Sequence, residues 1–198
     1  HELTSSVFGH SSFREGQMFL ISSILEGRDC LGIMPTGGGK SLCYQIPAMT
    51  LPGLALVVSP LISLMNDQVA ALRGSGVPAA AYNSSLSTEE RRHVRSGLRE
   101  GRLKLLYVSP ERLESPAFLE LLDGLHIPLV AVDEAHCISQ WGQDFRPSYL
   151  GIPDFIAGLP KRPVVAAFTA PATAEVRSDL IRLPRLQRPK VLVPGFDR

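Results

Sequence analysis

A glycine-rich segment directly after a short apolar run constrains the fold of this chain more than any other feature. Residues 30–34 read Cys-Leu-Gly-Ile-Met and are followed by Pro-Thr-Gly-Gly-Gly-Lys-Ser, which ends at Ser41. Small residues between a strand and a helix let several backbone N–H groups converge on one anion, and the helix N-terminus adds its positive dipole end. The segment therefore predicts a phosphate-binding loop that leads into a helix starting at Lys40. A glycine-rich turn with a chance lysine is the alternative interpretation.

The residues of this loop have separate expected roles. In the pattern G-x-x-x-x-G-K-[ST] the lysine reaches the β- and γ-phosphates and the hydroxyl ligates Mg²⁺, which assigns these roles to Lys40 and Ser41. The first position of the strict pattern is Gly, whereas this chain has Met34 there. The remaining loop contacts are expected from Thr36, Gly37, Gly38 and Gly39.

A second apolar run, which starts at residue 129, ends in the acidic pair Asp133 and Glu134. A buried strand that ends in adjacent carboxylates is where a phosphate-loop fold holds its metal and positions its attacking water. Asp133 is expected to hold Mg²⁺ and Glu134 to polarise the water. Together with the loop, the pair predicts hydrolysis of a nucleoside triphosphate. A solvated acidic pair at a strand end is the alternative.

Short apolar runs alternate with helical patterns along the chain. Apolar spacing between Leu61 and Leu72 predicts one helix, Ser87 opens a second in a capping box, and Ser115 ahead of Pro116 opens a third. The alternation predicts one three-layer α/β domain over residues 1–198, with a mainly parallel sheet covered by helices on both faces. Strands are expected at residues 30–34, 54–59, 79–82, 103–108, 129–133, 164–169 and 191–193.

Composition excludes several classes of protein. The 198 residues suffice for one large domain and are too few for two. A net charge of +1 gives no global signal of nucleic-acid binding, so such a contact must come from a local groove. Cys30, Cys43 and Cys137 are too widely spaced for a zinc motif or a disulfide framework. No apolar run reaches the roughly 18 residues that span a bilayer. The start at His1 without Met leads us to expect an excised part of a longer protein.

Further segments follow one another in a fixed order. They are Phe8-Gly-His-Ser-Ser-Phe-Arg-Glu-Gly-Gln17, Val58-Ser-Pro-Leu-Ile-Ser-Leu-Met-Asn-Asp-Gln68, Val108-Ser-Pro-Glu-Arg-Leu113, the run from Asp133 to Pro147, and Ala167-Phe-Thr-Ala170. With the phosphate loop, they resemble the superfamily 2 helicases and, within these, the RecQ family of DNA helicases. The resemblance runs from end to end of the chain. It implies a RecA-like domain, the first of the family's two motor lobes.

The resemblance also implies an adenine site upstream of the loop. Gln17 would pair with N6 and N7 of adenine, because its amide offers both a donor and an acceptor. His10 stands where the family stacks an aromatic ring on the base, and Arg14 stands at a basic position. For Gln17, a structural role in capping a helix is the alternative.

The segment after the acidic pair points to single-stranded DNA. Trp141, Phe145 and Arg146 are close in sequence, and bases stack on aromatic and guanidinium planes with about 1–3 kcal/mol per base. By resemblance, this is the aromatic-rich loop that senses single-stranded DNA and couples it to hydrolysis. Alternatively, Trp141 and Phe145 are ordinary core aromatics. Gln143 departs from the family pattern, which has His.

Other positions complete the expected coupling and DNA contacts. His136 is expected to bridge the nucleotide site to Thr169, in a segment where Pro171 replaces the family's second Thr. DNA backbone contacts are expected just past strand ends, where ligands bind to parallel sheets, although ordinary turns are the alternative. These contacts are assigned to Ser59, Pro60, Asn83 and Arg112.

Together these expectations describe the ATP-binding lobe of a 3′–5′ DNA helicase, with Lys40, Asp133, Glu134 and His136 as catalytic residues. Its expected partners are ATP with Mg²⁺, single-stranded DNA and duplex junctions, and no membrane. We expect a monomer in the bacterial cytoplasm, associated with the nucleoid. The family's second lobe, zinc-binding region and winged helix do not occur in these 198 residues. An RNA helicase, a nucleic-acid-stimulated ATPase without unwinding, and a degenerate nucleotide-binding module remain the alternatives.

Overall fold

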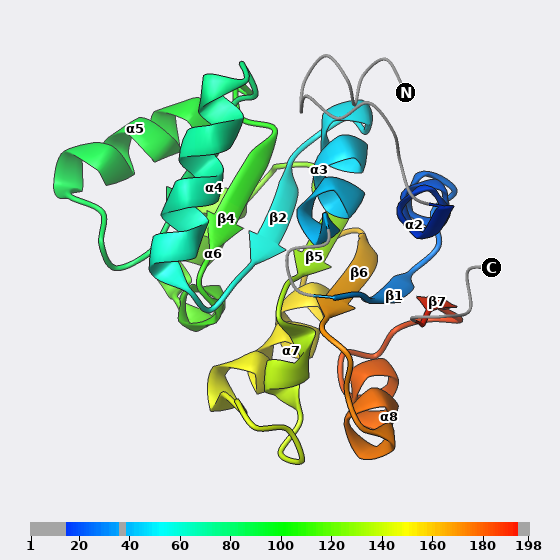
Figure 1. Ribbon diagram of the computed structural model, residues 1–198. Coiled ribbons are helices and arrows are strands. Elements are labelled where there is room, and N and C mark those ends of the chain that lie inside the picture. The colour runs from blue at the N-terminus through cyan, green and yellow to red at the C-terminus, as the bar shows by residue number, and fades with distance from the viewer. Residues whose placement is uncertain (1–14, 36–38, 194–198) are drawn as a thin grey trace.

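A parallel β-sheet runs through the centre of the molecule (Figure 1). The computed structural model describes residues 15–35 and 39–193, and within them the sheet has seven strands in the order β3-β4-β2-β5-β6-β1-β7. Every neighbouring pair of strands is parallel. The predicted α/β class with a parallel sheet is confirmed.

All the predicted strands are present. Those at residues 79–82 and 164–169 have the predicted bounds, and the other five differ by one or two residues at an end. The strands are β1 (Cys30–Ile33), β2 (Ala55–Val58), β3 (Ala79–Tyr82), β4 (Leu105–Val108), β5 (Leu129–Val132), β6 (Val164–Thr169) and β7 (Lys190–Leu192).

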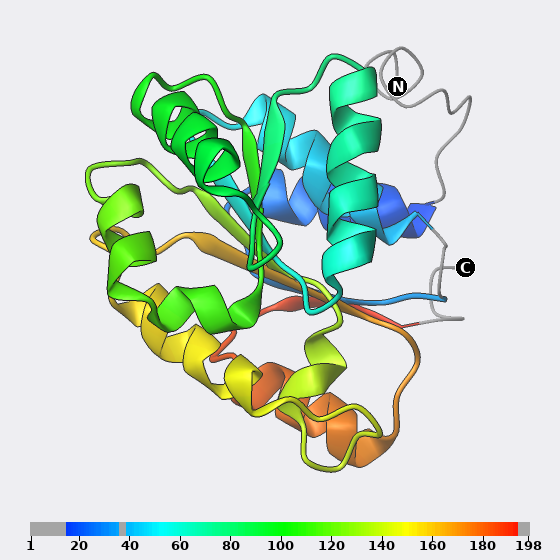
Figure 2. The same cartoon turned by 90° about the vertical axis from the view of Figure 1, so that its left-hand side faces the viewer.

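Helices cover both faces of the sheet. Consecutive strand residues alternate between two apolar clusters: Leu56 and Val58 belong to one, Ala55 and Val57 to the other. Figure 2 shows the sheet between the blue and cyan helices and the yellow and orange ones. On one face lie α2 (Glu15–Leu25), α3 (Lys40–Thr50) and α4 (Ile62–Gly74); on the other lie α5 (Thr88–Arg99), α6 (Pro116–Leu122), α7 (Ile152–Ala157) and α8 (Ala174–Arg182). Short 3-10 helices lie in the connections between strands and helices. They are η1 (Pro110–Glu114), between β4 and α6, and η2 (Ala135–Ile138) and η3 (Pro147–Gly151), between β5 and α7.

The predicted helix starts are confirmed by their hydrogen bonds. In α5, the Glu90 N–H donates to Ser87 Oγ at 3.1 Å and the Ser87 N–H donates to Glu90 Oε1 at 2.8 Å, which is a complete capping box. In α6, the Phe118 N–H donates to Ser115 Oγ at 3.4 Å.

The apolar pattern of α4 is wider than the surface it covers. Met65, Val69 and Leu72 are buried, but Leu61 and Leu64 are 39% and 42% exposed. The reason is position: α4 packs against β3, the strand at one end of the sheet, so less of the helix is covered.

A buried carboxylate fixes the opposite end of the sheet. Asp29 is only 3% exposed and accepts hydrogen bonds from Arg162 at 3.1 and 2.7 Å, from the Val165 N–H at 3.0 Å and from the Gln187 N–H at 2.7 Å. Its own carbonyl accepts from the Lys190 N–H at 2.9 Å, which places β7 beside β1.

The strand register brings the functional loops together. Val58 of β2 lies opposite Val132 of β5, and Ile33 of β1 lies opposite Thr169 of β6. The loops that follow these four strands therefore leave the sheet at the same edge, where ligands bind in parallel sheets. Among the described residues, we find no helix with the length and apolar character needed to cross a bilayer.

Candidate active site

The described part of the phosphate loop contains a left-handed glycine. Gly39 lies in the left-handed region, with φ 78° and ψ 23°, directly before α3, and the Leu42 N–H donates to its carbonyl at 3.2 Å. A residue with a side chain rarely adopts this φ, so glycine suits the turn. Lys40 and Ser41 follow in the first turn of α3 and are partly exposed. Thr36, Gly37 and Gly38 lie outside the described residues.

The Gln17 side chain contacts this loop from α2. Its Nε2 donates to the Gly39 carbonyl at 3.2 Å, and a Cβ added at Gly39 would overlap the same nitrogen. The contact joins the predicted adenine-recognition residue directly to the phosphate loop, and Gln17 itself is buried. His10 and Arg14, the other predicted base contacts, lie outside the described residues.

The carboxylate pair lies at the end of β5, and its first member is buried. Asp133 is 7% exposed, and its Oδ1 accepts from the Glu134 N–H at 2.9 Å. Burial raises the pKa of the Asp133 carboxyl, while the Lys40 ammonium lowers it and the neighbouring Glu134 raises it. A desolvated carboxylate that is stabilised by a nearby cation is suited to hold Mg²⁺, with the Ser41 hydroxyl as a second oxygen donor.

Glu134 has an unusual backbone conformation for a residue with a side chain. Its φ of 50° and ψ of 45° are left-handed. Non-glycine residues in this region are uncommon, and such strain concentrates at functional sites. The turn carries the chain from β5 into η2.

His136 joins the carboxylate pair to β6. Its Nδ1 lies 2.9 Å from Thr169 Oγ1 and 3.5 Å from Glu134 Oε2. The Thr169 carbonyl in turn accepts from the Met34 N–H at 2.9 Å, at the start of the phosphate loop. The predicted contact between His136 and Thr169 is therefore present, and Thr169 also touches the loop through its backbone.

The tryptophan of the aromatic segment lies on the surface. Trp141 is 73% exposed, which rules out the alternative that it is a core aromatic. Phe145 and Arg146 are partly buried. The Arg146 Nε is buried and has no hydrogen-bond partner among the residues that the structure describes. A buried donor without a partner is uncommon, and it marks this loop as incompletely satisfied in this arrangement.

A cavity of about 660 Å³ separates this loop from the end of β6. Its lining includes His136, Thr169, Trp141 and Asp144. His136, which contacts Glu134, thus also borders the cavity that Trp141 lines.

His136, Cys137 and Asp144 form a hydrogen-bonded cluster at this cavity. Their donor atoms lie within 4.8 Å of one another, and Cys137 Sγ donates to Asp144 Oδ2 at 3.8 Å. Burial raises the pKa of the Cys137 thiol to about 12, so it stays protonated, and Arg146 lies 3.4 Å from Asp144. A neutral thiol and an adjacent guanidinium disfavour a cation here, so the cluster serves to position the loop.

Two buried contacts that the sequence did not reveal hold the aromatic loop in place. Ser139 Oγ donates to Asp179 Oδ2 of α8 at 2.8 Å and accepts from the Trp141 N–H at 3.2 Å. Tyr149 donates to the Asp133 carbonyl at 2.8 Å. These pairs are 40 and 16 residues apart in sequence, and no local pattern links their members.

The predicted DNA-backbone residues differ in what they can contact. Arg112 and Pro60 are partly exposed, whereas Ser59 is buried at 4% exposure. Asn83 corrects our expectation: its side chain is fully buried and accepts from the Ser85 N–H at 2.9 Å. It shapes the turn from inside, and the neighbouring Ser84 is exposed.

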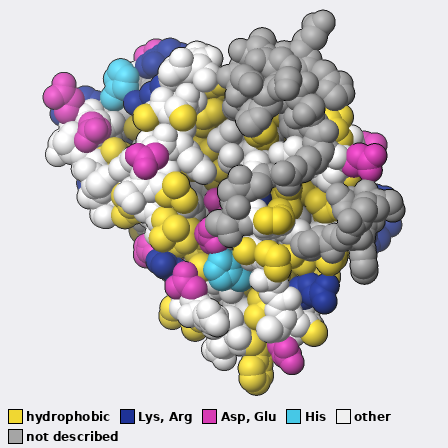
Figure 3. Space-filling view, in the orientation of Figure 1, with side chains coloured by type: hydrophobic (Ala, Val, Ile, Leu, Met, Phe, Trp, Pro, Cys, Tyr) yellow, Lys and Arg dark blue, Asp and Glu magenta, His cyan; other side chains and the backbone are white. Residues whose placement is uncertain are grey.

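Charge is dispersed on the face that carries these loops. Figure 3 shows Lys and Arg side chains scattered among acidic and apolar ones, where the described residues are visible. This agrees with the net charge of +1, and any nucleic-acid contact there is local.

Comparison with known proteins identifies the family. Residues 14–179 match the family model described as "DEAD/DEAH box helicase". The chain belongs to this family. This helicase chain is 49% identical over 197 residues to "ATP-dependent DNA helicase RecQ" of Bacillus subtilis (strain 168), which covers 99% of the chain and 33% of the relative. It is 48% identical to the protein of the same name from Pasteurella multocida (strain Pm70), covering 31% of that relative. The chain therefore spans about a third of the length of these curated relatives.

Solved structures share the fold of this helicase chain. The Pyrococcus furiosus Hef helicase domain superposes with a TM-score of 0.69 at 22% identity, over 91% of this chain and 38% of that one. The structure of the DUF1998 helicase MrfA bound to DNA and AMPPNP gives a TM-score of 0.75 at 16% identity, over 98% of this chain and 29% of that one. At these identities the likeness confirms the RecA-like helicase fold alone.

Proposed function

We propose that this chain is the ATP-binding lobe of a RecQ-type helicase that hydrolyses ATP to move 3′ to 5′ along single-stranded DNA and separate duplexes. One observation carries the proposal: His136 Nδ1 lies 2.9 Å from Thr169 Oγ1 and 3.5 Å from Glu134 Oε2. A single side chain thus touches both the carboxylate that would act on water and the end of β6, and it lines the same cavity as the exposed Trp141.

The residues divide the work of hydrolysis between binding and proton transfer. Lys40 binds the β- and γ-phosphates. Gln17, which is hydrogen-bonded to the Gly39 carbonyl, recognises the edge of the adenine base. Glu134 orients the attacking water and takes up its proton. Asp133 and Ser41 would hold Mg²⁺, which neutralises charge on the phosphates. His10, Arg14, Thr36, Gly37 and Gly38 stay predictions for the same site.

Coupling to DNA runs through the contacts of His136. When Glu134 gains a proton, its attraction for the imidazole falls and the balance of hydrogen bonds at Thr169 changes. Thr169 borders the same cavity as Trp141, so this change reaches the aromatic loop. Trp141 offers an exposed ring on which a base can stack, and the partly exposed Arg146 follows it in the same loop. Ser84 and Arg112, which follow β3 and β4, supply phosphate contacts at the same edge of the sheet.

Full turnover requires a second lobe. In related phosphoryl-transfer enzymes an arginine stabilises the transition state with a gain of about 10³ to 10⁵ in rate, and we assign that arginine to a region beyond this lobe. We propose that the intact protein acts as a monomer in the cytoplasm. Alone, this lobe should bind nucleotide weakly and unwind nothing.

The proposal is tested by measuring ATP hydrolysis with and without single-stranded DNA. The assay compares this chain with a protein that extends through a second lobe, and Lys40→Ala and Glu134→Gln serve as matched variants. We expect stimulation only in the longer protein, with nucleotide binding retained in Glu134→Gln and lost in Lys40→Ala. Turnover that ignores DNA in the longer protein would refute the motor role. Stronger stimulation by single-stranded RNA than by DNA would favour an RNA helicase instead.

A further inference from the structure

A groove lies between α6 and α7, which cover the same face of the sheet (Figure 2). Its volume is about 440 Å³. Glu114 and Gly151 line it where η1 and η3 end, and Asp123 and Gly158 line it where α6 and α7 end. We call this the helix groove. None of its lining residues is assigned to the candidate active site.

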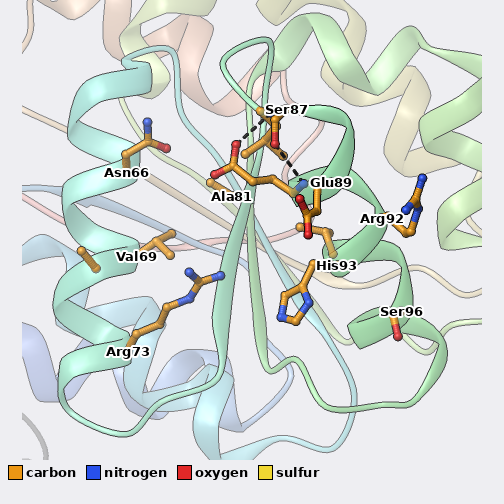
Figure 4. A pocket seen from close by; sticks show the side chains of 13 residues that line it. Asn66, Val69, Arg73, Ala81, Ser87, Glu89, Arg92, His93 and Ser96 are labelled. Atoms are coloured by element: carbon orange, nitrogen blue, oxygen red, sulfur yellow. Dashed lines mark hydrogen bonds between the residues drawn. The ribbon is translucent and has the colours of Figure 1, made fainter.

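The hollow beside β3 differs from the helix groove in its charges (Figure 4). It has a volume of about 800 Å³ and lies between α4 and α5. Basic and acidic side chains share its lining, and Arg73 Nε already donates to the Ala79 carbonyl at 2.7 Å. With balanced charges and an engaged arginine, that hollow selects no class of partner.

The floor of the helix groove is apolar. Leu113, Leu122 and Phe155 line it and belong to the buried core cluster on this face of the sheet. Leu119 of α6 also lines it and is 45% exposed, although its side chain is large and apolar. A partner that covered Leu119 would remove apolar surface from water, which favours binding.

The charged residues that line the helix groove are all acidic. Glu114 and Asp123 lie on the wall formed by η1 and α6, and Asp154 lies on α7. All three are exposed, and Glu114 and Asp123 form no ion pair in the described part of the chain. Asp154 lies 3.2 Å from Arg185, but an ion pair between two largely exposed groups contributes little. The three carboxylates are therefore free to pair with a partner.

The negative charge of the helix groove is local. Arg112 and Lys161 are next in sequence to the lining residues Leu113 and Pro160, but neither lines the groove. The chain as a whole has a net charge of +1, so cations are not attracted to every part of its surface. The groove itself repels nucleic-acid phosphates and attracts a cationic segment.

The walls also select the form of that segment. Because a helix bonds its own backbone groups, α6 and α7 offer no strand edge, and a partner must bind through side chains. Carboxylates on both walls flank the apolar floor, which matches an amphipathic helix whose apolar stripe has Lys or Arg on both sides. We propose that the helix groove binds a basic amphipathic helix of a partner protein.

The test uses this chain and a labelled, capped helical peptide of alanine, leucine and lysine. Its leucines lie on one face of the helix, and its lysines flank that face on both sides. One control peptide has the same composition with the leucines spread around the helix, and a second has glutamate in place of lysine. Fluorescence anisotropy gives the affinities, and NMR locates the site. We expect only the first peptide to bind and to shift the amide signals of Leu119 and Gly151.

Two pairs of matched substitutions test the mode of binding. Asp123→Lys should weaken the peptide by about tenfold, because it places a cation beside the lysines of the peptide. Glu26→Lys makes the same change at an exposed position just after α2, on the other face of the sheet, and should have little effect. Leu119→Ser should weaken binding more than Leu25→Ser, because Leu25 is 42% exposed but lies outside the groove. All four positions are exposed, so the melting temperature should not change.

Four results would overturn the proposal. Three of them are equal affinity for a control peptide, equal weakening by the two lysine substitutions, and equal weakening by the two serine substitutions. The fourth is binding to this chain that is lost in a protein that extends through a second lobe. In that case a segment of the same protein, and not a partner, would occupy the groove.

Discussion

Replacing Ser139 by alanine should loosen the aromatic loop at a predictable energetic cost. The Ser139 hydroxyl is fully buried and donates to Asp179 Oδ2 at 2.8 Å. A hydrogen bond to a charged group contributes about 1.5–3 kcal/mol. Asp179 keeps Arg182 at 2.8 Å on its other oxygen, so it is not left without a partner, and we expect a loss of about 2 kcal/mol.

This cost can be measured by calorimetry. For a domain of this size each kcal/mol shifts the melting temperature by about 2–4 °C, so Ser139→Ala should melt about 4–8 °C lower. Ser84→Ala, at an exposed position, is the control and should leave the melting temperature unchanged. A shift for Ser139→Ala no larger than that of the control would show that Ser139 does not anchor the loop to α8.

Three further substitutions probe the site itself. Asp133→Asn should raise the melting temperature near neutral pH and remove metal-dependent hydrolysis. Burial raises the pKa of the Asp133 carboxyl, so the folded protein loses stability as pH rises through that pKa, and the gain from the substitution should shrink on acidification. A lower melting temperature of the variant at neutral pH would contradict this. Gly39→Ala should destabilise the protein by about 1–2 kcal/mol, because φ is 78° there and the added Cβ meets Gln17. The control Gly74→Ala, whose added Cβ meets nothing within 4 Å, should not destabilise the protein. Equal effects of the two substitutions in urea unfolding would refute the argument. Trp141→Ala should leave the melting temperature unchanged, since the ring is 73% exposed, but should lower DNA-stimulated ATPase of the longer protein far more than basal ATPase; equal losses would assign Trp141 a structural role.

The strands could be predicted because buried parallel strands are continuous apolar runs. β1 and β5 are buried at every residue, and each is followed by polar or glycine-rich sequence that ends it. The strand order could not be predicted, because it depends on which runs pair across many intervening residues. The apolar spacing from Leu61 to Leu72 predicted a helix correctly, but could not tell that Leu61 and Leu64 would be exposed at the end of the sheet.

The parts of the candidate site that depend on a local sequence pattern or on the family resemblance could be predicted. The start of α3 at Lys40 follows from a glycine run between a strand and a helix, and the contact between His136 and Thr169 follows from the family resemblance. The bond between Ser139 and Asp179 could not be predicted, because a serine and an aspartate 40 residues apart carry no joint pattern. The burial of Asn83 was missed for another reason: an asparagine after a strand looks the same whether it faces a ligand or its own turn.

Asp29 has a consequence for solubility as well as for geometry. It holds Arg162 and the Gln187 N–H, and thereby keeps the short, partly exposed β7 against β1. Without β7, β1 would become the terminal strand of the sheet, and its fully apolar stretch would present unpaired backbone groups to other molecules. Such an edge recruits neighbouring chains into aggregates. By holding β7 in place, the buried Asp29 carboxylate thus protects the sheet against self-association at the end opposite β3.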